Sequence, residues 1–164
     1  MPKASEPGGA RLRVCLDLNV FVAAEIALAK GHRATTPLRL LQACREGRFD
    51  LVVSHAMLER LTAVLRRPPL NLSVELATER AELIAELAAL GNLLVVGGGV
   101  MPLRDVEGRG VLEAALAGRA DYLATYNLDD FAAAAERDSE TGFLRVRDLL
   151  ILHPADLVPI GGLL

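Results

Sequence analysis

Apolar residues along the chain follow two patterns: short continuous runs that predict buried strands, and spacings of three or four residues that predict helices. The apolar runs predict strands at residues 12–16, 49–53, 92–96, 122–125 and 149–152. The longer spacings predict helices at 20–29, 36–45, 111–117, 129–136 and 154–157, one that starts at Ser54 and stops before Pro68, and one from Ser73 to about Leu90. Strands therefore alternate with helices along the whole chain.

This alternation predicts an α/β fold with a central, mostly parallel sheet and helices on both of its faces. The length of 164 residues is that of one domain. Residues 1–10 are rich in Pro, Gly and Ser and predict a flexible tail, which leaves 11–164 as a single domain. In such a sheet, ligands bind at the carboxyl ends of the strands, so the residues after each strand are the candidates for chemistry.

Carboxylate and amide side chains follow four of the predicted strands. In chain order they are Asp17 and Asn19 after the first strand, Glu59 on the helix after the second, Asp105 and Glu107 after the third, and Asn127 after the fourth. Two carboxylates about 4 Å apart repel by roughly 4 kcal/mol at an effective dielectric constant of 20, so such a cluster favours a bound cation. Oxygen ligands suit Mg²⁺ or Mn²⁺, which can activate a water and stabilise a phosphoryl group during its transfer.

Each of these residues also has a purely structural interpretation. Asp17 can cap a helix, and Asn19 can form a turn. On a helical wheel, Glu59 lies about 160° from the centre of the apolar face of its helix, which predicts an exposed side chain. Asp105 and Glu107 precede a helix, whose N-terminus favours negative charge in any case.

Composition narrows the possible functions. A net charge of −3 and an aromatic content of 4%, with no Trp, argue against a protein that grips long nucleic acid through its phosphates or binds single strands on aromatic platforms. Cys15 and Cys44 lie in apolar surroundings, which predicts buried thiols in a reducing compartment. Because no signal peptide or membrane span is recognisable, we expect a cytoplasmic protein. The hydrophobic content of 52% in so small a chain predicts a homodimer that pairs through apolar helix faces.

Several motifs together resemble those of the PIN-domain family. The sequence LDLNV at 16–20 resembles the opening motif of the family, in which an aspartate ends the first strand. The segments LRDVE at 103–107 and VLEAALAGRADYL at 111–123 resemble its second half, and TYNLDDF at 125–131 its closing motif. The resemblance implies a compact three-layer α/β/α sandwich. It also implies an Mg²⁺- or Mn²⁺-dependent RNase, typically the toxin of a bacterial toxin–antitoxin pair, with RNA as substrate and an antitoxin as partner.

The resemblance also assigns roles by position. Asp17 would be the first metal ligand, and Asn19 would steady it. Asn127 stands at the fourth position of the site, where the family has Asp or Asn. Asp105 and Glu107 would complete the metal ligands if the loop that carries them bends toward the site.

Two positions depart from the family pattern. The glutamate expected six residues after Ser54 is Arg60, and Glu59 comes one residue early. The acid expected at the start of the helix before the Leu-Glu-Ala-Ala segment is Gly108. A fixed positive charge at Arg60 would oppose the binding of a cation.

Three functions therefore remain compatible with the sequence. The first is a metal-dependent ribonuclease. The second is a degenerate PIN domain that binds RNA or a protein without cutting, which an Arg60 side chain at the metal position would favour. The third is an aspartyl phosphotransferase with Asp17 as the nucleophile, but such enzymes usually carry Asp-x-Asp, whereas residue 19 is Asn.

Overall fold

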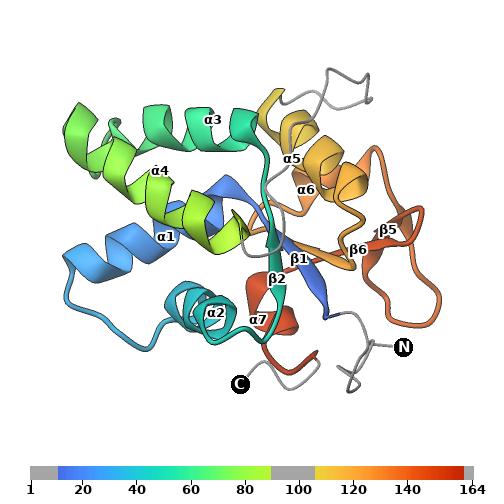
Figure 1. Cartoon of the computed structure of the whole chain (residues 1–164). Helices are drawn as coiled ribbons and strands as arrows, with labels where there is room; N and C mark the ends of the chain where they lie inside the picture. Colours follow the sequence, from blue (N-terminus) through green and yellow to red (C-terminus); the bar gives the residue numbers. More distant parts are fainter. Residues whose placement is uncertain (1–10, 90–105, 161–164) are drawn as a thin grey trace.

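The computed structural model describes residues 11–89 and 106–160 (Figure 1). Six strands of this part form one sheet: β1 (Arg13–Leu16), β2 (Asp50–Val52), β3 (Tyr122–Ala124), β4 (Glu136–Arg137), β5 (Leu144–Val146) and β6 (Leu149–Leu152). The helices are α1 (Leu18–Ala29), α2 (Thr36–Arg45), α3 (His55–Leu65), α4 (Val74–Ala89), α5 (Val106–Ala117), α6 (Asp129–Ala132) and α7 (Pro154–Leu157). The α/β prediction is therefore confirmed.

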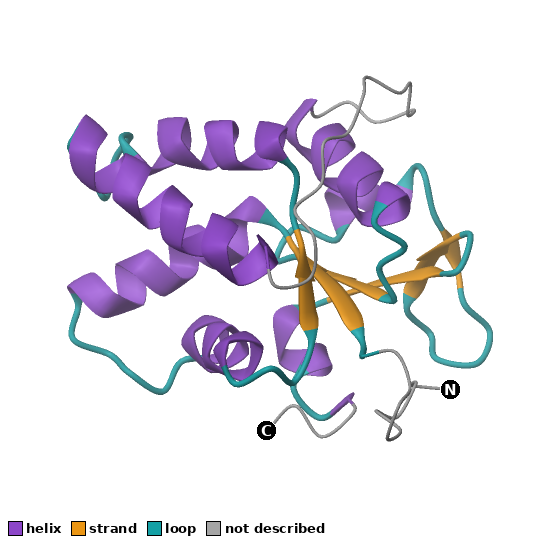
Figure 2. Cartoon of the chain, in the orientation of Figure 1, coloured by secondary structure: helices purple, strands orange, loops and turns teal. Residues whose placement is uncertain are grey.

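The sheet is mixed, with the strand order β2-β1-β3-β6-β5-β4. Strands β2, β1, β3 and β6 run parallel to one another, whereas β5 pairs with β6 and β4 with β5 in antiparallel directions. Figure 2 shows the helices gathered around the parallel strands and the β4–β5 hairpin at the far edge of the sheet. The parallel strands are almost wholly buried, which explains why they were recognisable as apolar runs.

The antiparallel edge was not predicted. We expected a helix over 129–136, but α6 ends at Ala132, and the chain turns into β4. Alanines at 132–135 favour a helix intrinsically. Tertiary structure overrides them, because Phe131 is fully buried and the exposed residues Glu136 and Arg137 pair with β5. Strand β4 is polar and has two residues, and β5 has three residues with Arg145 between two apolar ones, so neither forms a continuous apolar run.

Capping residues mark the starts of several helices. Helices α2 and α7 and strand β6 have the predicted bounds. Ser54 caps α3 by accepting a hydrogen bond from the Met57 N–H, and Ser73 does the same for the Leu76 N–H at the start of α4. Helix α1 begins at Leu18, two residues earlier than predicted, because Asp17 is its cap. Helix α5 begins at Val106, five residues earlier than predicted.

Predictions about the cysteines and about membrane spans can also be compared with the structure. Cys15 and Cys44 are both buried and free, as expected for reduced thiols. None of the described helices is long and apolar enough to cross a membrane. The predicted tail at 1–10 and the predicted strand at 92–96 lie outside the described residues.

Candidate functional site

The carboxyl ends of the four parallel strands bring polar residues to one edge of the sheet. Leu16 of β1 pairs with Ala124 of β3, and Ala124 pairs with Leu152 of β6. The residues that follow these strands, Asp17, Thr125 and His153, are therefore neighbours in space although they are far apart in sequence. This edge is where an α/β sheet binds its ligands.

Asp17 is fixed at this edge by both its backbone and its side chain. Its N–H donates to the Ala124 carbonyl at 2.9 Å, which continues the β1–β3 pairing by one residue. Its Oδ1 accepts a 2.7 Å hydrogen bond from the Leu18 N–H, so the capping role expected of this residue is real. The side chain is also buried, with 9% of the residue exposed. A buried carboxylate is unfavourable unless hydrogen bonds or a cation compensate it, so its other contacts are informative.

The other oxygen of Asp17 belongs to a network centred on Thr125. The Thr125 hydroxyl donates to Asp17 Oδ2 at 2.7 Å. The same hydroxyl oxygen accepts from Asn19 Nδ2 at 3.3 Å and from the Asn127 N–H at 3.0 Å. Because a hydroxyl has one proton and two lone pairs, the two N–H donors direct its proton to Asp17. Thr125 is completely buried, so water does not compete for these bonds.

Asn19 links the ends of β1 and β3. Its Nδ2 lies 3.4 Å from Asp17 Oδ2, and its Oδ1 accepts from the Tyr126 N–H at 3.4 Å. The structure thus brings Asp17, Asn19 and Asn127 together, three of the six residues selected from the sequence. The side chain of Asn127 is exposed beside the buried network and can reach a ligand from solvent.

The remaining candidates are placed differently. Glu59 is exposed on α3, opposite the buried residues Met57 and Leu61, as the helical wheel predicted. It makes none of the hydrogen bonds of the Asp17 network. Asp105 lies outside the described residues, and so does the side chain of Glu107, although its backbone belongs to α5.

A family model for the PIN domain matches residues 13–129, which is more than half of the chain. The chain belongs to the PIN-domain family. No curated protein and no solved structure matches it. The matched segment runs from β1 to the start of α6, so it contains Asp17, Thr125 and Asn127.

The strand-end network of this PIN domain offers oxygen donors of the kind that hard cations take. The donors are the Asp17 carboxylate and, on the exposed residue beside it, the amide oxygen of Asn127. Such ligands fit Mg²⁺ or Mn²⁺ and not softer metals. A carboxylate has about four lone-pair sites, so it can accept hydrogen bonds and bind a metal together. Among the side chains that the structure describes, however, no three of His, Cys, Asp or Glu gather closely enough to hold a metal. Further carboxylates would have to come from elsewhere in the chain.

Cys15 lies in β1, two residues before Asp17. Burial, and secondly the charge of Asp17, raise the pKa of the Cys15 thiol well above its usual range. Cys15 therefore stays protonated and is no candidate for a nucleophile.

Thr125 is the residue that sequence reasoning did not select. A Thr directly after a predicted strand, two residues before Asn127, was visible in the sequence. A hydroxyl, however, carries no charge and belongs to no recognisable ligand set. Its importance follows from burial and from its three hydrogen-bond partners, which come from two segments more than 100 residues apart.

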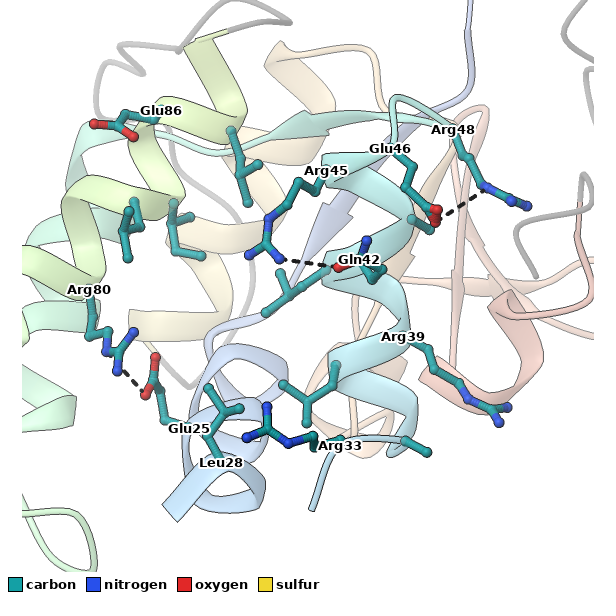
Figure 3. Close-up of a pocket in the computed structure, with 17 residues that line it drawn as sticks. Glu25, Leu28, Arg33, Arg39, Gln42, Arg45, Glu46, Arg48, Arg80 and Glu86 are labelled. Carbon is teal, nitrogen blue, oxygen red and sulfur yellow. Dashed lines mark hydrogen bonds and ion pairs between the residues drawn. The ribbon is translucent and has the colours of Figure 1, made fainter. Parts of the chain in front are cut away.

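A second feature of the PIN domain is a groove of about 1000 Å³ between α1, α2 and α4 (Figure 3). The apolar residues Leu28 and Leu83 line it and are exposed. Five arginines and three glutamates surround them. Figure 3 shows Arg45 extending from α2 toward α4, and Arg80 facing Glu25. Arg80 Nε lies 3.5 Å from Glu25 Oε2.

Proposed function

We propose that this PIN domain is a divalent-metal-dependent ribonuclease. The observation that carries the proposal is the buried Asp17–Thr125–Asn19 network at the carboxyl ends of β1 and β3, in a chain that belongs to this family. A carboxylate at this edge, held rigidly by a hydroxyl and an amide, is preorganised for a cation.

The residues of the network take distinct roles. Asp17 is the first metal ligand, and Asp105 and Glu107 are the other carboxylates proposed for the metal. Thr125 and Asn19 hold the Asp17 carboxylate in place. Asn127, with its exposed amide, is suited to contact a phosphate oxygen of the RNA. Bound Mg²⁺ or Mn²⁺ would supply an activated water and stabilise the charge on the phosphoryl group.

Direct assays test this proposal. Calorimetric titration with Mn²⁺ should show binding by the native chain and none by Asp17→Asn. A mixed RNA substrate should be cut by the native chain in Mn²⁺, and the cutting should stop in the presence of a chelator. If Asp17→Asn binds Mn²⁺ and cuts RNA like the native chain, this edge of the sheet is not the active site.

A second candidate function is favoured by Arg60, which stands where the family usually has a glutamate and is exposed on α3. In this alternative, the PIN domain binds RNA or a protein without cutting. RNA binding and cleavage assays with and without Mn²⁺ distinguish the two functions. A degenerate domain would bind RNA equally well under both conditions and would leave it intact. Glu59 is the carboxylate of α3 that would take the place of the expected glutamate in an active enzyme.

The proposal extends to the partners of the domain. As a toxin of a toxin–antitoxin pair, it would act in the cytoplasm as a homodimer and bind a small antitoxin. The arginine-rich groove between α1, α2 and α4 supports this, because its exposed leucines and its excess of positive charge suit an acidic amphipathic segment. We also infer that the helices form two layers around the sheet, as the three-layer sandwich of the family implies.

A further inference from the structure

Tyr126 is an exposed aromatic residue beside the strand-end network. Tyr126 has 36% of its surface exposed. The other exposed large hydrophobic side chains among the described residues are aliphatic. Tyr126 follows the buried Thr125 directly, and its N–H donates to Asn19 Oδ1. The backbone that carries the Tyr126 ring is therefore tied to the same residues that hold Asp17.

The Tyr126 ring is also braced from the neighbouring strand. His153 follows β6, which lies next to β3, and the two rings meet edge to face with centroids 5.0 Å apart and an angle of 86° between their planes. The orientation of His153 is itself fixed, because its Nδ1 accepts a 3.1 Å hydrogen bond from the Ala155 N–H and so caps α7. Single exposed apolar side chains are common and need no explanation. The Tyr126 ring differs from these, because its backbone and the fixed His153 ring already hold it in place. Binding a ligand therefore costs little of the side-chain entropy that ordering a free ring would cost.

We propose that Tyr126, supported by His153, is a stacking position for one unpaired base of the RNA whose backbone is cut at the Asp17 site. The proposal rests on the ribonuclease function and adds to it a position that holds one unpaired base of the substrate. Proteins recognise unpaired RNA bases mainly by stacking them on aromatic side chains, whereas the bases of a duplex are already stacked and inaccessible. One aromatic position also agrees with the low aromatic content, because it contacts one base without forming an extended platform.

The chain is well suited to a direct optical test. It contains two tyrosines and no tryptophan, and the other tyrosine, Tyr122, is buried in β3. A Tyr122→Phe variant therefore leaves Tyr126 as the one source of tyrosine fluorescence. Titration of this variant with a short single-stranded RNA in the presence of a chelator should quench the emission as the base stacks. A hairpin duplex of the same composition should quench it far less.

Kinetics provide the second measurement. Tyr126→Ala should raise the KM for single-stranded RNA about 5- to 150-fold, the range expected for losing one base–aromatic stack, while kcat changes little because the contact persists from ground state to transition state. Tyr126→Phe keeps the ring and should behave like the native chain. Leu76→Ala on α4 removes a side chain of the same 36% exposure far along the chain and serves as the matched control. His153→Asn retains a capping side chain but removes the ring, and should give a smaller rise in KM.

The results of these experiments distinguish a failure of stacking at Tyr126 from a failure of the ribonuclease function. If the native chain cuts RNA but Tyr126→Ala leaves KM unchanged and no quenching occurs, stacking at Tyr126 is refuted and the ribonuclease stands. If the native chain binds single-stranded RNA with quenching but never cuts it, the stacking position is supported in a degenerate domain. If the native chain neither binds nor cuts RNA, both proposals are overturned.

Discussion

The hydroxyl of Thr125 donates a 2.7 Å hydrogen bond to Oδ2 of Asp17, across the boundary between two neighbouring parallel strands. The two residues are separated by 108 positions in the sequence. Both are buried, so the bond forms in a low-dielectric environment in which it is strong and in which its loss is costly. The candidate site is therefore held together by a residue that has no charge of its own.

Replacing Thr125 by Val should damage both stability and activity. Valine has nearly the same shape, but it removes the donor to Asp17 and the acceptor for Asn19 and Asn127. We expect the free energy of unfolding to fall by about 1–3 kcal/mol, because buried polar groups lose their partners. We expect Mn²⁺-dependent cleavage of RNA to fall by about 10–100-fold, the usual effect of losing a group that orients a metal ligand. Urea unfolding and a cleavage assay measure the two effects.

Thr125→Ser is the matched control for this prediction. Serine retains the hydroxyl and loses one methyl group, so its cleavage activity should stay within a few-fold of that of the native chain. Should Thr125→Ser lose activity while Thr125→Val keeps it, packing of the methyl group, which valine retains, would be the role of Thr125, and the hydroxyl network would not matter for cleavage.

The two departures from the family pattern lead to a gain-of-function prediction. At an effective dielectric constant of 20 and about 5 Å, a unit positive charge repels a divalent ion by several kcal/mol, so Arg60→Glu would turn repulsion into attraction. Gly108 lies in the first turn of α5, where a carboxylate is favourable to the helix. The double variant Arg60→Glu/Gly108→Asp should therefore bind Mn²⁺ more tightly and cut RNA faster than the native chain.

Adding Asp17→Asn to the double variant should abolish both gains. The double variant Arg66→Gln/Arg67→Glu, past the last residue of α3, makes the same change in net charge and serves as the control. If the native chain already binds Mn²⁺ tightly and the double variant gains nothing, then Glu59, Asp105 and Glu107 supply sufficient ligands, and the departures carry no functional cost.

Much of the fold could be predicted because burial and capping leave local signals. The buried parallel strands are continuous apolar runs, and Asp17, Ser54 and Ser73 mark the starts of helices. Because parallel strands end at the same edge, the convergence of Asp17, Asn19 and Asn127 also followed from their positions after strands. The β4–β5 hairpin could not be predicted in this way, since its polar residues are ordered by tertiary pairing. Thr125 was missed for a similar reason, because its side-chain partners Asp17 and Asn19 are distant in sequence.

The groove between α1, α2 and α4 gives a prediction about the proposed antitoxin partner. Arg33, Arg45 and the exposed Leu28 all line the groove. The double variant Arg33→Glu/Arg45→Glu should weaken the binding of an acidic antitoxin segment at least about tenfold, and raising the salt concentration should weaken the binding of the native chain as well. The partner to test is a small protein encoded next to this chain, measured by calorimetry. The control is Arg66→Glu/Arg67→Glu, which makes the same change in net charge at exposed residues that do not line the groove. Equal loss in the control variant would mean that net charge, and not the groove, governs the affinity.

The wall of the same groove contains a carboxyl group whose protonation is linked to folding. Glu25 of α1 is partly buried, and its Oε2 lies 3.5 Å from Arg80 Nε on α4. Burial raises the pKa of Glu25 above its ordinary value of 4.5, and the opposing effect of Arg80 is smaller. Because the folded chain then binds more protons at Glu25 than the unfolded chain does, this group contributes full stability below its ordinary pKa. That contribution is lost as the pH rises through the raised value.

Glu25→Gln removes this linkage, since glutamine does not titrate. Relative to the variant, the native chain should therefore lose free energy of unfolding as the pH rises from about 4, and the difference should level off once the raised pKa has been passed. Urea unfolding of both proteins from about pH 3 to about pH 8 measures it. In an Arg80→Met background, the charge that lowers the pKa of Glu25 is absent, so the loss should be larger and should extend to higher pH. A difference that instead grows in favour of the native chain as the pH rises would show that the Glu25–Arg80 ion pair outweighs burial, and that this groove wall is stabilised by its charges.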